Sequence, residues 1–327
     1  MSGYYLLKNG EYAYNKSYSV GYDFGSVKRL DRYDMGALST LYICFALKKH
    51  DSDFIKAYFD SLKWYREIYR ISAEGARNHG LLNVPTDEFF DTKHYMPQDS
   101  AEQRKIADFM IALEHRIEAQ QSLVDNLKKY KRGLLSAVFS QNVSMFSTAD
   151  FYAFSELAVR RSEKYDPKCN AHAVCIELEH IEQETGRIIG STCADYQNSI
   201  KTVCKPGDVM FGKLRPYLRK YAFVQKECVC SSEIWSLIPT DIVIPKYLFY
   251  LIQSEAFMKV ANVSSGTKMP RAEWSTIAKS GYLIPSKDDQ QATVDILETT
   301  DRIIVSHVAS YDRLIEYKKG LLQRLFI

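Results

Sequence analysis

The sequence predicts an α+β protein in which α/β globular domains are joined by two long antiparallel coiled-coil helices. Three observations predict this fold class: a long segment occurs twice, each copy has helical periodicity without proline, and short β-rich runs fill the sequence between them. The 327 residues are 46% hydrophobic and 25% charged, a composition typical of folded proteins rather than disordered or fibrous ones. A chain of this length usually forms two domains.

The repeated segment covers residues 102–139 and 289–326, which align without a gap and are identical at 11 of 38 positions. The strongest match joins Tyr-Lys-Arg-Gly-Leu-Leu at 130–135 to Tyr-Lys-Lys-Gly-Leu-Leu at 317–322. A helix of about 38 residues is roughly 57 Å long, which is longer than a compact domain. Its apolar stripe therefore needs a partner, and the other copy is the obvious candidate.

Apolar residues in the first copy recur at alternating steps of three and four, which is the pattern of a coiled-coil seam. The second copy follows a looser version of this pattern. Gly133 and Gly320 lie inside the helical runs at a cost of about 1 kcal/mol each relative to alanine, which indicates a close crossing, a bend or a turn. The residues predicted to pair the two helices are Ile106, Met110, Leu113, Ile117, Val124, Leu127, Ile296, Ile304, Tyr311 and Leu314.

The sequence between the two helices reads as one mixed α/β unit. We expect strands near 173–178, 209–211, 220–224 and 233–238, and helical spacing is present over 245–260. The sequence before the first long helix has a similar order of elements, with strands near 10–14 and 40–47 followed by a helix over 54–69. If the chain is a twofold repeat, its first unit is about 50 residues shorter than its second, so we expect the chain to start inside a domain.

Several functional classes lack their motifs in this sequence. We find no phosphate-binding loop with its lysine, no glycine-rich loop of a methyl-donor pocket and no nucleophile elbow, so we expect a non-catalytic protein without a cofactor or a metal. No apolar run is long enough to span a membrane, and the first residues lack the pattern of a secretory signal. The seven cysteines fit no common zinc spacing, and we expect reduced, packed thiols in a cytoplasmic protein.

The repeated helices resemble those of the specificity subunits of type I restriction-modification systems. The resemblance covers nearly the whole chain, and its most specific part is a proline, a Glu/Asp-Gln pair and a long helix ending in Tyr-Lys-Lys/Arg-Gly-Leu-Leu, present twice. Further similar stretches are Gly-Asp-Val-Met-Phe at 207–211 and Ser-Ser-Glu-Ile-Trp at 231–235. The expected segments are a partial first target-recognition domain (1–98), the first long helix (99–141), a second target-recognition domain (142–286) and the second long helix (287–327).

In the second unit, basic residues alternate with tyrosine and proline in the stretch 211–221. Such a loop suits contacts with phosphates and with a guanine edge, although a solvated charged hairpin would have the same composition. Three further segments, at 15–18, 77–79 and 268–271, are also interpreted as DNA contacts. For each, the alternative is a surface turn or a loop held by its own hydrogen bonds. The predicted DNA-binding residues are Lys213, Arg215, Tyr217, Arg219, Lys220, Lys268, Arg271, Asn15, Lys16, Tyr18, Arg77, Asn78 and His79.

The resemblance implies a sequence-specific DNA-binding subunit whose two recognition domains read the halves of a split target, held apart by the paired helices. Its implied partners are double-stranded DNA and methyltransferase subunits, and it allows an ATP-dependent endonuclease subunit, a second copy or a second specificity fragment. The net charge of +3 neither requires nor excludes DNA. Two alternatives stay open: a coiled-coil scaffold that does not bind DNA, and a truncated or silent fragment that serves as a recombination cassette.

Overall fold

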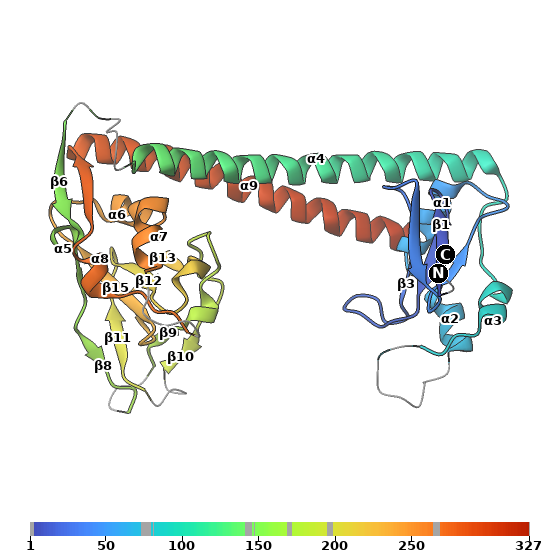
Figure 1. Cartoon of the computed structure of the whole chain (residues 1–327), viewed down its shortest axis with the longest axis horizontal. Coiled ribbons are helices and arrows are strands. Elements are labelled where there is room, and N and C mark those ends of the chain that lie inside the picture. Colours follow the sequence, from blue (N-terminus) through green and yellow to red (C-terminus); the bar gives the residue numbers. More distant parts are fainter. Residues whose placement is uncertain are drawn as a thin grey trace. The chain divides into compact units, whose positions relative to one another are not determined.

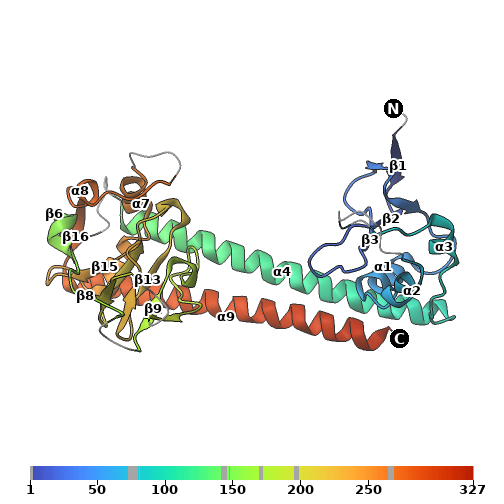
Figure 2. The same ribbon diagram turned by 90° about the horizontal axis from the view of Figure 1, so that it is seen from below.

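The computed structural model describes residues 3–72, 80, 82–140, 146, 148–168, 172–194, 199–263 and 269–326. The chain divides into two compact units, of which unit 1 contains residues 1–123 and 307–327 and unit 2 contains residues 124–306. Two long helices, α4 (Ser100–Val138) and α9 (Lys287–Leu325), each contribute to both units (Figures 1 and 2). The α+β fold class and the two long helices are thereby confirmed.

Unit 1 contains two small antiparallel sheets and three short helices. One sheet is two-stranded, in the order β1-β4, and the other is three-stranded, in the order β3-β2-β5. Its core contains many aromatic residues, with Tyr12, Phe54 and Trp64 fully buried. Leu322 of α9 and Phe326, just after the end of this helix, join the core. The elements are β1 (Tyr4–Lys8), β2 (Tyr12–Asn15), β3 (Ser26–Arg29), β4 (Met35–Ser39), β5 (Ile43–Phe45), α1 (Ser52–Asp60), α2 (Tyr65–Ile71) and α3 (Thr86–Asp91).

Unit 2 contains a five-stranded sheet in the order β10-β9-β14-β11-β8, a four-stranded sheet in the order β13-β12-β15-β7 and the pair β16-β6. The elements are β6 (Ala149–Ala153), α5 (Phe154–Leu157), β7 (Ala158–Arg160), β8 (Lys164–Tyr165), β9 (Val174–Ile176), η1 (Leu178–His180), β10 (Thr192–Cys193), β11 (Lys201–Cys204), β12 (Val209–Gly212), η3 (Pro216–Leu218), β13 (Tyr221–Phe223), β14 (Cys228–Cys230), β15 (Ile234–Pro239), α6 (Pro245–Leu251), α7 (Glu255–Ala261), α8 (Trp274–Ile277) and β16 (Gly281–Pro285).

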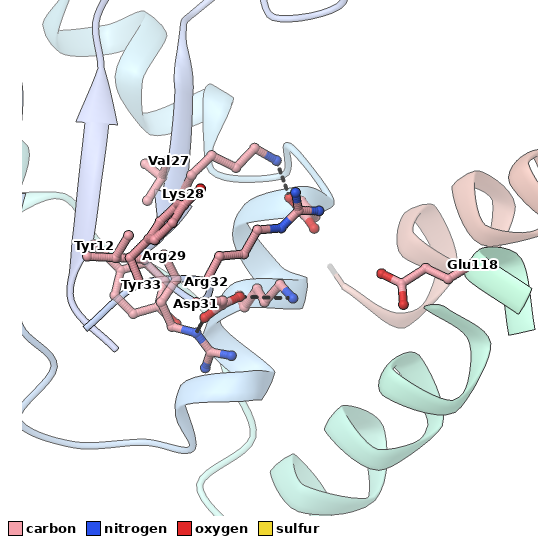
Figure 3. A pocket seen from close by; sticks show the side chains of 11 residues that line it. Tyr12, Val27, Lys28, Arg29, Asp31, Arg32, Tyr33 and Glu118 are labelled. Carbon is pink, nitrogen blue, oxygen red and sulfur yellow. Dashed lines mark hydrogen bonds and ion pairs between the residues drawn. The ribbon is translucent and has the colours of Figure 1, made fainter. Parts of the chain in front are cut away.

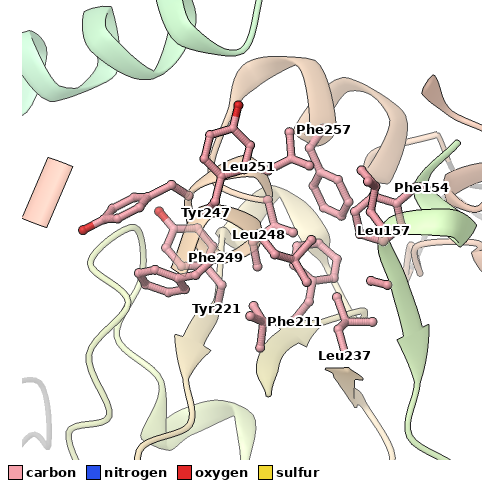
Figure 4. Packing of buried hydrophobic residues seen from close by; sticks show 14 of the residues in the cluster. Phe154, Leu157, Phe211, Tyr221, Leu237, Tyr247, Leu248, Phe249, Leu251 and Phe257 are labelled. Carbon is pink, nitrogen blue, oxygen red and sulfur yellow. The ribbon is translucent and has the colours of Figure 1, made fainter. Parts of the chain in front are cut away.

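The core of unit 2 lies between the four-stranded sheet and the helices α6 and α7. Figure 4 shows Phe211 and Leu237 of the sheet pointing toward Leu248 and Phe257 of these helices. Leu135 and Phe139 at the end of α4 also belong to this core, as Leu322 and Phe326 belong to that of unit 1. Burial of such large side chains stabilises the fold by roughly 1.5–3 kcal/mol each.

The helix predicted over 54–69 is two helices, and so is the one predicted over 245–260. In unit 1, α1 ends at Asp60, Ser61 caps it, and Leu62 has a positive φ of 61° that a continuous helix cannot accommodate. In unit 2, the Ser254 hydroxyl accepts a hydrogen bond from the backbone N–H of Phe257 and starts α7 as its N-cap. Apolar spacing continues across both breaks, which is why it did not reveal them.

Both long helices begin with the same glutamine anchor. The buried Gln103 accepts a hydrogen bond from the backbone N–H of Asp51, which is the N-cap of α1, and donates one to the carbonyl of Pro97. Gln290 makes the equivalent contacts with the N-cap Ile244 of α6 and with Pro285. These contacts explain physically why the repeated motif combines a proline with a glutamine several residues later.

The packed face of the two helices contains most of the predicted pairing residues. Met110, Leu113, Ile117 and Val124 are buried, whereas Ile106, Leu127, Ile304, Tyr311 and Leu314 are partly exposed. Ile296 is 56% exposed and does not lie in this face. The buried α9 positions here are Gln290, Thr293, Val294, Leu297 and Thr300, because this half of α9 packs on the unit 2 core with the wider helical stripe of a globular domain.

Candidate nucleic-acid interface

In unit 2, the loop between β12 and β13 lies against the segment that precedes α8. The Lys213 carbonyl accepts a hydrogen bond from the Ala272 N–H at 2.8 Å, and the Arg215 N–H donates one to the Pro270 carbonyl at the same distance. Leu214 and Arg271 form an isolated antiparallel bridge. Two of the segments predicted from the sequence are thus brought together, although they are about 55 residues apart in the chain.

The β12–β13 loop is held in an unusual backbone conformation. Arg215 and Arg219 both have left-handed φ values, 51° and 49°, on either side of the short helix η3. Neither residue is glycine, so the conformation costs of order 1–3 kcal/mol at each. Pro216 begins η3 with its ring buried, which fixes the backbone immediately after Arg215. Strain of this kind is found most often where a loop presents side chains to a ligand.

Three of the predicted DNA-binding side chains in the β12–β13 loop and in the segment before α8 are held by other parts of unit 2. Arg219 forms an ion pair with Glu255 at 2.6 Å, and the Lys220 ammonium donates to the Leu178 carbonyl at 2.6 Å. Arg271 donates two hydrogen bonds to Glu233, at 3.0 and 3.1 Å. The Arg271 hydrogen bonds lower the pKa of Glu233 below its usual value, against the effect of burial.

Lys213, Arg215 and Tyr217 remain as the side chains available to a ligand. Arg215 and Tyr217 are exposed, Lys213 is half-buried, and none of the three has a side-chain hydrogen bond or ion pair to another described residue. One lysine, one arginine and one tyrosine on a rigid loop are suited to contact phosphates and a base edge. Lys268 lies outside the described residues.

Unit 1 contains a loop in the corresponding place, after β2. The Asn15 side chain accepts a hydrogen bond from the Ser17 N–H at 3.0 Å, and the Lys16 carbonyl accepts one from Leu82. The Tyr18 N–H donates to the Gly80 carbonyl at 2.7 Å, and its ring is exposed. The predicted residues Arg77, Asn78 and His79 lie outside the described part of the chain.

Arg160 at the end of β7 is a functional candidate that the sequence did not reveal. Its guanidinium lies 4.9 Å from the ring centre of Trp274 and 5.8 Å from that of Trp235. Trp274 follows the loop segment that contains Arg271, so Arg160 adds an exposed cation to the same region. Only tertiary pairing of β7 with β15 brings Arg160 there, and the sequence around it carries no motif.

Unit 1 also has a cavity of about 520 Å³ with many charged groups in its lining. Figure 3 shows Lys28, Arg29 and Asp31 grouped on one side of this cavity and Glu118 on the other. The cations are largely neutralised: Lys28 pairs with Asp60 at 2.6 Å, and Arg29 pairs with Asp31 and with Asp53. The lining holds four cations and three acids, so the cavity lacks the large excess of cations that an anion site needs.

Within the described residues, no group of three or more His, Cys, Asp or Glu side chains could hold a metal ion. The six cysteines there are free thiols, and Cys175, Cys204 and Cys230 are buried. A search of the described residues also finds no helix with the length and apolarity needed to cross a bilayer.

Comparison with known proteins identifies the class of module that carries these loops. Residues 162–314 match the family model described as "Type I restriction modification DNA specificity domain". The matched segment is just under half of the chain, and it contains both loops of unit 2. The resemblance inferred from the repeated helices is confirmed.

Particular relatives agree with this assignment. The chain is 28% identical over 145 residues to the Type I restriction enzyme HindI specificity subunit of Haemophilus influenzae, and the match covers 42% of this chain and 31% of that protein. The matched region thus spans about a third of the length of that curated relative.

Solved structures of the same class share the fold over nearly the whole chain. A chain from a structure described as "Structural basis underlying complex assembly and conformational transition of the type I R-M system" has a TM-score of 0.64 at 13% identity, covering 99% of this chain and 83% of that one. The HsdS subunit from Thermoanaerobacter tengcongensis has a TM-score of 0.50 at 13% identity, covering 98% and 81%. The fold is that of type I specificity subunits.

Proposed function

We propose that this chain is a DNA-reading specificity subunit of a type I restriction-modification complex and that unit 2 reads one half of a split target. The observation that carries the proposal is that the specificity-domain match over residues 162–314 includes both the 213–219 loop and the adjoining segment 269–272. Lys213, Arg215 and Tyr217 contact DNA from this rigid loop, and Arg160 extends the basic surface. Arg271 holds the adjoining segment through Glu233, and Lys268 precedes it in the same stretch of sequence.

The loop after β2 in unit 1 is proposed to contact the second half of the target. Asn15 ends β2, and Lys16 and Tyr18 follow this strand at the same distances at which Lys213 and Arg215 follow β12. Arg77, Asn78 and His79 precede Gly80, whose carbonyl supports the loop. Arg219 and Lys220 contribute by holding the unit 2 loop in shape.

The repeated helix motif is proposed to bind methyltransferase subunits. An ATP-dependent endonuclease subunit is proposed as a further partner of the complex that this chain and those subunits form. Each copy of the motif exposes a tyrosine, Tyr130 or Tyr317, and three residues later a glycine, Gly133 or Gly320. No atom lies within 4 Å of a Cβ built at either glycine, apart from its chain neighbours and its own helix backbone. The same open surface thus occurs twice, which suits two copies of one partner. Methylation and cleavage are assigned to those partners, and this chain supplies recognition only.

Binding to a random-sequence duplex over a range of salt concentrations tests the proposal. We expect the logarithm of the binding constant to fall linearly with the logarithm of salt, because phosphate contacts release counterions. Arg215→Ala should reduce the slope by about 1, while Arg302→Ala, which removes an exposed arginine of α9 outside both loops, should leave it unchanged. Binding that does not depend on salt, or no binding, would instead favour a helix-pair scaffold.

A further inference from the structure

Three cysteines of unit 2 share one face of the five-stranded sheet. In the antiparallel pair of β11 and β14, Cys204 lies directly opposite Cys228, and Cys230 follows two residues later on β14. Side chains alternate between the two faces of a strand, so the three thiols lie on the same side of the sheet. Cys204 and Cys230 accordingly belong to one hydrophobic cluster, and Cys228 packs against it.

The three thiols interact with one another. Hydrogen bonds from the thiols of Cys228 and Cys230 lower the pKa of the Cys204 thiol, against the effect of burial. Cys204 and Cys230 are fully buried, whereas Cys228 is partly exposed. A small solute can therefore reach one thiol of the cluster, and a second, hidden thiol lies directly opposite it.

The strand register selects Cys204 and Cys228 as the pair that a disulfide can join. Directly opposite residues of antiparallel strands have Cα atoms about 4.5–5.5 Å apart, which is within the range of about 4.4–6.8 Å found in disulfides. Cys230 is the diagonal neighbour of Cys204, and diagonal neighbours are about 7–8 Å apart. Beyond about 7 Å a disulfide cannot close without movement of the backbone.

We propose that Cys204 and Cys228 form a reversible disulfide when the protein meets a small hydroperoxide. With hydrogen peroxide, the Cys228 sulfur attacks one peroxide oxygen and the O–O bond breaks. Cys228 becomes a sulfenic acid, and its thiol proton leaves with the second oxygen as water. The Cys204 sulfur then attacks the Cys228 sulfur, the S–O bond breaks, and the hydroxyl group leaves with the Cys204 proton as a second water. Two thiols are oxidised and one peroxide is reduced.

The disulfide would close the segment 204–228, which contains β12, η3 and β13. The loop of Lys213, Arg215 and Tyr217 lies inside this segment. A cross-link restricts the unfolded chain and thereby favours the folded state, so oxidation should stabilise the part of unit 2 that holds the loop. The disulfide itself does not depend on whether this loop reads DNA.

Cys44 and Cys193 provide a comparison within the same chain. Both are partly exposed, as Cys228 is. Cys44 lies opposite Ala13, and Cys193 lies opposite Val174, so neither faces a thiol across its strand pair. A peroxide that reaches them should leave oxygen acids of sulfur rather than a disulfide.

Peptide mapping of the full chain by mass spectrometry tests the disulfide. The protein is treated with hydrogen peroxide, its remaining thiols are alkylated, and it is digested without reduction. We expect a linked pair of peptides that contain Cys204 and Cys228, with the summed mass of the two peptides less two hydrogen atoms, and its loss after treatment with dithiothreitol. No linked pair under conditions that oxidise Cys44, or a link from Cys204 to Cys230 instead, overturns the proposal.

Urea unfolding gives a second readout. Peroxide should raise the urea midpoint of the wild type, and dithiothreitol should reverse the shift. Cys193→Ser is the matched control and should show the same rise, whereas Cys228→Ser should show none. Circular dichroism of the reduced variants checks that they fold, and peptide mapping of the wild type decides the question if Cys228→Ser does not. An equal rise in Cys228→Ser, or no rise in the wild type, contradicts a stabilising disulfide.

Discussion

Lys318 on α9 holds its ammonium nitrogen 2.7 Å from a carboxylate oxygen of Glu114 on α4. The repeat produces the same pair in unit 2, where Lys131 lies 2.7 Å from Asp301. In each unit the lysine belongs to the Tyr-Lys-Lys/Arg-Gly-Leu-Leu motif and the acid lies in the other long helix. The two ion pairs, together with the hydrogen bond from Gln120 to His307, define how α4 and α9 pair in antiparallel order.

Lys131→Ala should destabilise the protein by about 2–3 kcal/mol. The Lys131 ammonium is buried and also donates a hydrogen bond to the buried Gln253. Removing Lys131 leaves the Gln253 side-chain oxygen without this donor, and it leaves Asp301 without its cation and with only the hydrogen bond from Tyr250. Lys129→Ala, on the exposed side of the same helix, should change stability by less than about 0.5 kcal/mol. Urea unfolding followed by circular dichroism measures both values, and equal effects would contradict the buried pair.

Acidification should weaken unit 1 through Glu114. Burial alone would raise the pKa of Glu114, but the hydrogen bonds and charges of Lys318 and Lys56 outweigh it, and the pKa is lowered below its ordinary value. The carboxylate therefore stabilises the folded state above the unfolded pKa, and this contribution is lost as the pH falls through the folded pKa. We expect the free energy of unfolding to fall below about pH 5.

Glu114→Gln removes this contribution and should flatten the acid side of the stability profile. Glu118→Gln is the control, because Glu118 is exposed on the same helix and forms no ion pair with another described residue. Parallel profiles for wild type and Glu114→Gln, measured by urea unfolding between about pH 3 and pH 7, would argue against the role of this carboxylate.

The double change Leu113→Asp and Ile117→Asp should unpair the helices in unit 1. Both side chains are buried, and two charges in an apolar seam cost more than about 4 kcal/mol. The expected result is a large loss of helical signal on mild heating. Aspartate at the exposed neighbours Ala112 and His115 should leave the melting curve nearly unchanged. A wild-type curve for the seam variant would remove these residues from the packed face.

Gly133→Ala and Gly320→Ala should each stabilise the isolated chain by about 1 kcal/mol. Both glycines lie in exposed helix interiors with open space around the added Cβ, so only the helix propensity changes. If these glycines admit a partner subunit, the same variants should bind it more weakly. A loss of stability in urea unfolding would show that each glycine serves an internal contact.

The long helices could be predicted because their periodicity extends over many turns and because the repeat supplies two independent copies. The helix breaks at Leu62 and Ser254 could not, since a positive φ and a serine cap interrupt the backbone without interrupting the apolar spacing. The loop residues around Arg215 were identified by composition. Which of these side chains are free to contact DNA could not be predicted, because Glu255, Leu178 and Glu233, which hold the others, are distant from them in the sequence.

The exposure of Ile296 was not predicted either, because it depends on what each half of α9 packs against. The heptad pattern treats α9 as a coiled coil along its whole length, but the first half of this helix packs on a globular core, which shifts the buried face toward Val294 and Leu297. Arg160 was missed because β pairing alone brings it to Trp274.

Selection of bound duplexes from a random-sequence library, carried out in parallel with wild-type protein and with Arg215→Ala, tests most directly whether unit 2 reads DNA through its loop. We expect wild-type protein to enrich a short block of fixed sequence and Arg215→Ala protein to lose the preference for at least one base pair within it. No enrichment by the wild type, or the same enriched block for both proteins, would contradict it.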